Sequence, residues 1–263
     1  MVDWSSSAEL AIESDVFTKF MHAIFGLYVW EWMLSLDFDW EYISGRKRFR
    51  WPMIFYFANR YILLGAMIGI VVALDVSHPI NCKALYTFNQ LAGDAALGLA
   101  SINLSLRTIA VWSHNKIVIG VLVVVILGHW SLILQGVLLN AAYIDGACTI
   151  TSSNNTVLAA TFIYSMVFDL GVLVLNTWKL MGRRWSTEGI HSTRLGKMLF
   201  RDGLIYFIIA FLLNLVATVF MLLDLNEVMS VIFNVPAAVG STIVACRVVR
   251  RLIRFTADGV EML

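Results

Sequence analysis

The chain has 263 residues, of which 59% are hydrophobic and only 14% charged, and its formal net charge is +1. A soluble domain has roughly 45–50% apolar and about 25% charged residues, so the composition excludes an ordinary soluble domain. It indicates an integral membrane protein, which we expect in the plasma membrane. The basic residues border apolar segments, which is typical of membrane anchoring and not of nucleic-acid binding.

Residues 1–16 precede the first apolar stretch and carry four acidic residues and no basic one. This pattern predicts that no signal peptide is cleaved and that the first helix inserts as its own signal.

Seven apolar stretches are each long enough to cross a bilayer as a helix, which takes about 20 residues. They lack the alternation of barrel strands, so the sequence predicts an all-α, seven-transmembrane helix bundle that forms one domain over residues 1–263. Pro236 lies within the last stretch and is expected to kink it. The predicted spans are about 17–36, 52–75, 91–112, 117–139, 157–181, 202–223 and 226–248.

Positive charge gathers on one side of these spans. Cytoplasmic loops are rich in Lys and Arg, so the N-terminus is predicted outside and the C-terminus in the cytoplasm. Sixteen of the 19 basic residues follow this pattern: Arg46, Lys47, Arg48, Arg50, Arg107, Lys116, Lys179, Arg183, Arg184, Arg194, Lys197, Arg201, Arg247, Arg250, Arg251 and Arg254. The exceptions are Lys19, Arg60 and Lys83, of which only Arg60 is expected deep in the membrane.

Three cysteines are distributed over both faces. Cys82 and Cys148 fall in the outer loops 76–90 and 140–156, where an oxidising environment favours a disulfide between them; the alternative is two free thiols. Cys246, at the inner end of the last span, is expected to be a buried thiol, with palmitoylation as the alternative.

Two N-glycosylation sequons occur in the chain. Asn154 begins one of them in an outer loop, close to the fifth span, and is the candidate glycosylation site. The other begins at Asn103 inside the third span, where it cannot be reached.

Ionisable side chains within spans are functional candidates. They are Lys19, His22, Glu31, Arg60, Asp94, Arg107, His129 and Asp169. Glu31 and Arg60 lie at similar depth near the inner ends of the first two spans, because each residue of a helix adds about 1.5 Å. The sequence therefore predicts a Glu31–Arg60 ion pair, whose role is interpreted as structural in preference to functional.

Asp94 lies about one turn below the predicted outer end of the third span. It is predicted either to face an outward pocket and bind a cationic or hydroxyl ligand, or to bond Gln90 or Asn89. His129 and Asp169, near mid-membrane on adjacent helices, are predicted either to form a proton-sensitive pair or to be buried and internally hydrogen-bonded.

Asn214 and Asn234 complete the set of candidate ligand-binding residues. Together with Asn176 they are also expected to hydrogen-bond between helices, which contributes about 0.6–2 kcal/mol each in lipid.

Several kinds of chemistry lack their residues. A retinal protein needs a Lys near the middle of its last helix, and this span has none. Zinc and bis-histidine haem sites fail because His22 and His129 lie at different depths. No cofactor and no metal are therefore expected, and no catalytic set points to an enzyme.

Two motifs resemble those of a large family of seven-helix membrane proteins from mushroom-forming fungi, known as a domain of unknown function. The first runs from Trp32 to Asp37, continues through Glu41 and the basic run, and ends with Asn59-Arg60-Tyr61. The second is Leu106 to Trp112, where Ile109 and Val111 replace an aromatic residue and Leu. The resemblance covers about half the chain and implies a fungal origin and seven helices, but no activity.

The expected topology is also similar to that of G-protein-coupled receptors. Arg107 would stand where those receptors keep a basic switch residue, and Arg183 and Arg184 lie in an inner loop suited to coupling. That loop, residues 182–201, fits either anionic lipids or a cytosolic signalling partner.

These features favour a receptor-like protein that senses a small ligand at the outer side and signals through basic cytoplasmic loops. The alternatives are a channel, transporter or scramblase, formed as a homo-oligomer with Asp94, His129 and Asp169 along a polar path, or a structural membrane protein.

Overall fold

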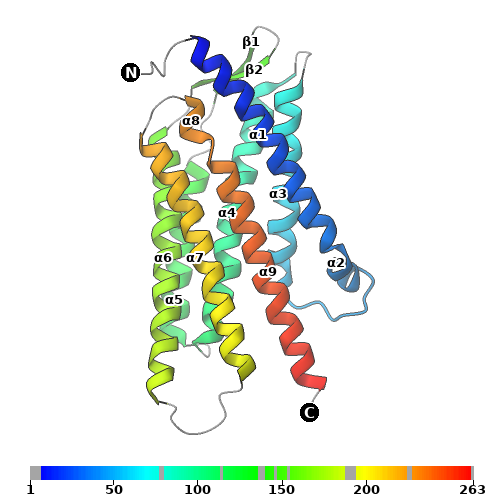
Figure 1. The fold of residues 1–263 in the computed structure, drawn as a ribbon, viewed down its shortest axis with the longest axis vertical. Helices are drawn as coiled ribbons and strands as arrows, with labels where there is room; N and C mark the ends of the chain where they lie inside the picture. Colours follow the sequence, from blue (N-terminus) through cyan, green and yellow to red (C-terminus); the bar gives the residue numbers. More distant parts are fainter. Residues whose placement is uncertain are drawn as a thin grey trace.

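The computed structural model describes residues 7–76, 80–112, 115–135, 140–144, 147–152, 155–186, 194–223 and 227–261. In this part of the chain, seven long helices form an elongated bundle (Figure 1). The long helices are α1 (Ser7–Leu34), α3 (Met53–Asp75), α4 (Cys82–Val111), α5 (Lys116–Gln135), α6 (Asn155–Ser186), α7 (Arg194–Leu223) and α9 (Asn234–Glu261). The remaining elements are the short helices α2 (Leu36–Ile43) and α8 (Glu227–Val231) and an antiparallel hairpin of β1 (Asn140–Ile144) and β2 (Ala147–Ser152).

Five helical segments of the described chain are long and apolar enough to cross a membrane. They are Met53–Asp75, Lys116–Gln135, Ala159–Lys179, Ile205–Leu223 and Val228–Ile253. Helix α5 is mostly exposed, and Ile117, Val124 and Leu134 point away from the bundle, each more than 60% exposed. Such an apolar outer surface suits contact with lipid chains, so an integral membrane protein is indicated.

The two ends of the bundle differ in composition. Figure 1 shows the α2–α3 linker, the α4–α5 connection, the adjoining ends of α6 and α7 and the end of α9 at one end, which we call the basic end. The four groups of basic residues lie in the linker, in the adjoining ends of α4 and α5 and of α6 and α7, and from the middle of α9 onward. The start of α1 and the β1–β2 hairpin lie at the opposite end, which we call the hairpin end.

Helix α4 is the centre of the bundle and contacts α3, α5, α6 and α9. Half of its 30 residues are buried, and many of these are Ala, Gly or Ser, which let neighbouring helices approach closely. Where α4 packs on α3, a Cβ added to Gly69 of α3 would lie 2.0 Å from Asn89 Oδ1. The glycine therefore makes room for the buried amide of Asn89.

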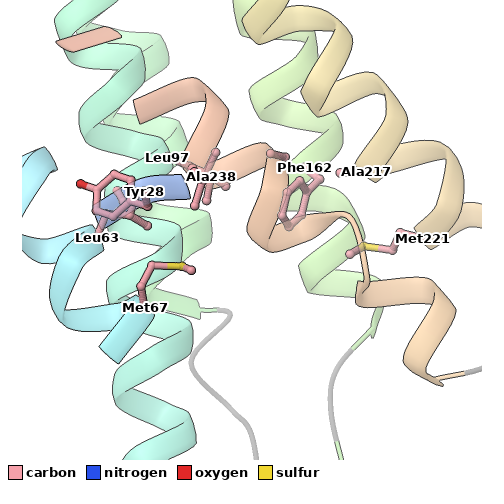
Figure 2. Packing of buried hydrophobic residues seen from close by; sticks show 11 residues of the cluster. Tyr28, Leu63, Met67, Leu97, Phe162, Ala217, Met221 and Ala238 are labelled. Carbon is pink, nitrogen blue, oxygen red and sulfur yellow. The ribbon is translucent and has the colours of Figure 1, made fainter. Parts of the chain in front are cut away.

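Three clusters of buried apolar side chains form the core, and the first of them draws on six helices. Tyr28 of α1, Leu63 of α3, Leu97 of α4 and Phe162 of α6 belong to one buried cluster (Figure 2). Met221 of α7 joins the same cluster, as do residues of α9. A second cluster lies between α4, α5, α6, α7 and α9, and a third, smaller one joins α2, α3 and α9 around Phe38 and Tyr56.

The structure departs from the sequence interpretation at both terminal helices. Helix α1 ends at Leu34, where Ser35 Oγ donates to the carbonyl oxygen of Glu31 at 2.9 Å, and α2 follows as a separate helix. The expected kink at Pro236 is wrong. The helix is interrupted between α8 and α9, and Pro236 lies in the first turn of α9. A proline there lacks an N–H that has no helical partner in any case.

Two other boundaries also differ from the sequence interpretation. Helix α4 begins at Cys82, nine residues before the predicted start of the third span at 91. The predicted outer loop 140–156 contains the β1–β2 hairpin. The extension of α4 matters for the site, since it places Asp94 three turns into the helix.

Candidate functional site

The predicted Glu31–Arg60 ion pair is wrong, because each residue pairs with a different partner. Arg60 Nε lies 2.9 Å from Asp39 Oδ2, and both side chains are almost completely buried. Glu31 binds Arg247 and Arg250 of α9. The prediction failed because α2 folds back after Ser35 and brings Asp39 to α3, which the expected continuous first helix excluded.

Arg60 joins α1, α2 and α3 through several contacts. Its guanidinium donates to Ser35 Oγ and to the carbonyl oxygen of Trp32, and lies 5.6 Å from the centre of the Trp32 ring. Tyr28 of α1 donates to the Arg60 carbonyl oxygen at 2.7 Å. Arg60 is therefore held at its backbone and at its charged end.

Asp39 accepts from two tyrosines of α3 in addition to its contact with Arg60. The Tyr56 hydroxyl donates to Oδ1 at 2.9 Å, and the Tyr61 hydroxyl donates to Oδ2 at 3.3 Å. Burial raises the pKa of the Asp39 carboxyl, against the opposing effects of Arg60 and the two hydroxyl groups. Since this desolvation is costly, the carboxylate depends on its partners.

Glu31 of α1 forms ion pairs with two arginines of α9 at the basic end. Arg247 donates from Nε to Oε1 at 3.0 Å and from Nη2 to Oε2 at 2.5 Å, which is the bidentate geometry of a strong Arg–carboxylate pair. Arg250 adds a bond from Nη2 to Oε1 at 2.8 Å. Arg247 is half-exposed, whereas Glu31 and Arg250 are largely buried.

Asp94 presents the opposite situation. It is 6% exposed, yet no residue in the described ranges forms a hydrogen bond or an ion pair with it. The alternative in which Asp94 bonds Asn89 is wrong, since neither amide atom of Asn89 has a partner. Asp94 lies one helical turn before Gly98, on the same face. Gly98 abuts Trp130 and Ile133 of α5.

His129 and Asp169 lie at similar depth, as predicted, but they do not pair. Ile133 touches Gly98, so His129, one turn further toward the basic end, is level with about residue 101 of α4. Asn176 of α6 donates to Thr108 of α4 at 2.9 Å, and counting back seven residues along both parallel helices brings Asp169 level with Ser101.

Their side chains have other neighbours. The His129 ring stacks on Tyr164 at 5.6 Å, and its Nε2 has no hydrogen-bond partner among the described residues. Asp169 Oδ2 accepts from Asn214 Nδ2 of α7 at 2.6 Å. The proton-sensitive pair is therefore wrong, and for Asp169 the alternative of internal hydrogen bonding is confirmed.

Buried amides do join the helices. Besides the bond from Asn214, Asn103 donates to the carbonyl oxygen of Phe55, and Thr242 of α9 donates to Asn59 Oδ1 of α3 at 3.0 Å. Asn234 is the first residue of α9, and its Oδ1 has no partner in the described part. The expected interhelical role is thus confirmed for Asn176 and Asn214, but it does not extend to Asn234.

The remaining candidates fall at the two ends. Cys82, the first residue of α4, is disulfide-bonded. Cys148 lies in β2 with its side chain outside the described part, so their pairing stays a prediction. Asn154 also lies outside the described residues. Cys246 is a buried free thiol, as expected, and Asn103 is buried within α4.

The coupling candidates lie at the basic end. Arg107 of α4 places its guanidinium 5.7 Å from the centre of the Phe207 ring of α7. Arg183 and Arg184 belong to the end of α6, and their side chains are outside the described part.

Among the described residues, no group of three or more His, Cys, Asp or Glu side chains could hold a metal ion.

No family model and no curated protein matches the chain. The motif that carries the fungal resemblance nevertheless has a structural meaning. Contacts that join α1, α2, α3 and α9 involve five residues of this motif: Trp32, Ser35, Asn59, Arg60 and Tyr61. Sequence reasoning missed Asp39 and Tyr56 as buried neighbours of Arg60, and it missed Arg247 as the partner of Glu31.

Proposed function

We propose that the chain is a receptor-like integral membrane protein that binds a small ligand at Asp94 and signals at its basic end. In this proposal all seven long helices cross the membrane, with the hairpin end outside and the basic end in the cytoplasm. The membrane is the plasma membrane, and the chain belongs to the fungal seven-helix family that its N-terminal motif resembles. The clustering of basic residues at one end supports the orientation.

The observation that carries the proposal is the carboxylate of Asp94, which is buried and has no partner among the described residues. Burying an ionised group without a partner costs several kcal/mol, so such residues in membrane helices usually serve binding or transport. Asp39, Glu31 and Asp169 each have a partner in the described structure, which makes Asp94 the exception.

The position of Asp94 defines the chemistry of a ligand. The face of α4 that carries Asp94 and Gly98 is turned toward α5, between the middle of the bundle and the hairpin end. A carboxylate there accepts hydrogen bonds and attracts positive charge, so the expected ligand carries an amine or a hydroxyl group and approaches from the hairpin end.

A path for the signal runs through the central helix. Helix α4 packs on α9, and α9 carries the arginines that hold Glu31 of α1. A ligand that displaces α4 against α9 would therefore alter contacts at the basic end, where a cytosolic partner would read the change. Packed helices change between discrete arrangements and do not deform continuously.

The test is a thermal-shift screen of the purified protein against amines and polyols. We expect a ligand-dependent rise in the unfolding temperature that is abolished by Asp94→Asn. Asp169→Asn is the matched control, since it removes a buried carboxylate at another depth and keeps an oxygen that can accept from Asn214. Stabilisation that survives Asp94→Asn, or is lost equally in Asp169→Asn, would contradict the proposed anchor.

A second function is favoured by polar atoms near the level of Ser101. His129 Nε2, Ser165 Oγ and Asn214 Oδ1 are buried and have no hydrogen-bond partner in the described part. Such groups could line a polar path in a channel, transporter or scramblase, formed as a homo-oligomer. The test compares ion or lipid flux in proteoliposomes with flux in protein-free liposomes. A higher flux that Asn214→Leu reduces supports this function, and equal flux excludes it.

A further inference from the structure

The corner between α2 and α3 presents a basic and aromatic surface. Helix α2 turns Phe38 and Asp39 inward, where both are buried, and leaves Trp40 and Ile43 61% and 64% exposed. The linker that follows, residues 44–52, contains the densest run of basic residues in the chain. We call this surface, made of α2 and residues 44–52, the corner.

Alternate residues of the linker are held against the protein. Lys47 Nζ binds Glu41 Oε2 at 2.6 Å and lies 5.9 Å from the centre of the Phe38 ring. Phe49 stacks on Phe57 with ring centroids 6.2 Å apart. These contacts fix the course of the linker over α2 and α3.

Trp51 continues the same pattern, because it packs edge-on against Phe55 of α3 at 6.0 Å. Arg46, Arg48 and Arg50 alternate with these residues and are exposed, and Phe49 and Trp51 also keep more than half of their surface exposed. No hydrogen bond or ion pair joins the side chain of any of the three to the described residues. Three guanidinium groups are thus presented by a segment that its neighbours hold in place.

The local charge balance is positive. Asp39 is neutralised by Arg60, and Glu41 is neutralised by Lys47. Asp37 is the remaining acidic residue of the corner, against the three free arginines. The corner therefore attracts anions, and guanidinium groups bind phosphate oxygens with two parallel hydrogen bonds.

We infer that the corner binds the phosphate headgroups of anionic phospholipids, with Arg46, Arg48 and Arg50 as the headgroup ligands and Trp40 and Trp51 at the boundary of the acyl chains. The exposed indoles decide in favour of a lipid, since Trp side chains prefer the interface between headgroups and hydrocarbon. This site is separate from Asp94 and does not depend on the proposed receptor function.

The test measures binding of two soluble short-chain lipids, dioctanoyl phosphatidylserine and dioctanoyl phosphatidylinositol bisphosphate, to the full-length protein in detergent. The variant Arg46→Gln/Arg48→Gln/Arg50→Gln is compared with Lys19→Gln/Lys83→Gln/Lys116→Gln, which removes the same charge at exposed lysines elsewhere. Each basic residue near a surface contributes roughly five-fold to binding, so the arginine variant should lose roughly 100-fold. The lysine variant should bind like the wild-type protein.

Free inositol trisphosphate separates a lipid site from a phosphate site. We expect Trp40→Ala/Trp51→Ala to weaken binding of the phosphatidylinositol lipid and to leave binding of free inositol trisphosphate unchanged. Equal losses in the arginine and lysine variants would overturn the assignment of the site to the corner. If the tryptophan variant binds the lipid as the wild-type protein does, the corner is a phosphate site and the lipid assignment is wrong.

Discussion

The basic end and the middle of the bundle differ in the partners of their buried carboxyl groups. At the basic end, Asp39 and Glu31 are held by arginines of other helices. In the middle, Asp169 has a neutral amide as its partner, and Asp94 has no partner in the described structure. The charges at the basic end therefore belong to the fold, whereas the charge at Asp94 has to be explained by something other than stability.

The comparison also separates two kinds of polar contact between helices. Ion pairs at the basic end join elements that are far apart in sequence, such as α1 and α9. Neutral amide and hydroxyl contacts, such as Asn176 with Thr108 and Thr242 with Asn59, join helices that the apolar core already holds together. Changes at the two kinds of contact should therefore differ in magnitude.

The largest effect is expected for Arg60→Met. The substitution leaves Asp39 buried without its cation, and breaking a buried ion pair in this way costs about 3–5 kcal/mol. The free energy of unfolding of the purified protein measures the loss. The double variant Asp39→Asn/Arg60→Met removes both charges and should recover part of the lost stability. If the single variant is as stable as the wild-type protein, Arg60 does not stabilise the basic end.

A smaller loss is expected for Glu31→Gln. Hydrogen bonds to charged groups contribute about 1.5–3 kcal/mol, and Arg247 remains half-exposed and hydrated after the substitution. Glu41→Gln is the control, because its pair with Lys47 is partly exposed and exposed pairs contribute about 0–1 kcal/mol. Equal losses in the two variants would contradict the structural role assigned to Glu31.

A still smaller loss is expected for a neutral contact between helices, in the variant Thr108→Val. The bond from Asn176 then disappears while the volume is nearly kept, and interhelical hydrogen bonds in membranes average about 0.6 kcal/mol. A double-mutant cycle with Asn176→Leu measures the coupling. A coupling energy as large as that of the Arg60–Asp39 pair would remove the distinction between ion pairs and neutral contacts.

The sequence predicted the helical class, the approximate helix positions and the gathering of basic residues at one end. These depend on hydropathy and charge, which are local properties of the chain. It did not predict the partners of Glu31 and Arg60, because pairing depends on how helices fold back. The break at Ser35 places Asp39 against α3, and the packing of α1 on α9 brings Glu31 to Arg247.

Depth was likewise easier to predict than orientation. Helix length places His129 and Asp169 at one level, but the rotation of α5 and α6 turns them to different neighbours, Tyr164 and Asn214. Asp94 was expected one turn from the outer end of its helix, and only the extension of α4 to Cys82 shows how far inside the helix it lies.

The most direct test of the distinction between the two regions is the free energy of unfolding of Asp94→Asn without ligand. An unpaired buried carboxylate contributes no stabilising contact, and removing its charge removes a desolvation cost. We therefore predict that Asp94→Asn is at least as stable as the wild-type protein. A loss of about 3 kcal/mol or more, comparable to that of a broken buried ion pair, would show that Asp94 is part of the fold and would contradict its assignment to ligand binding.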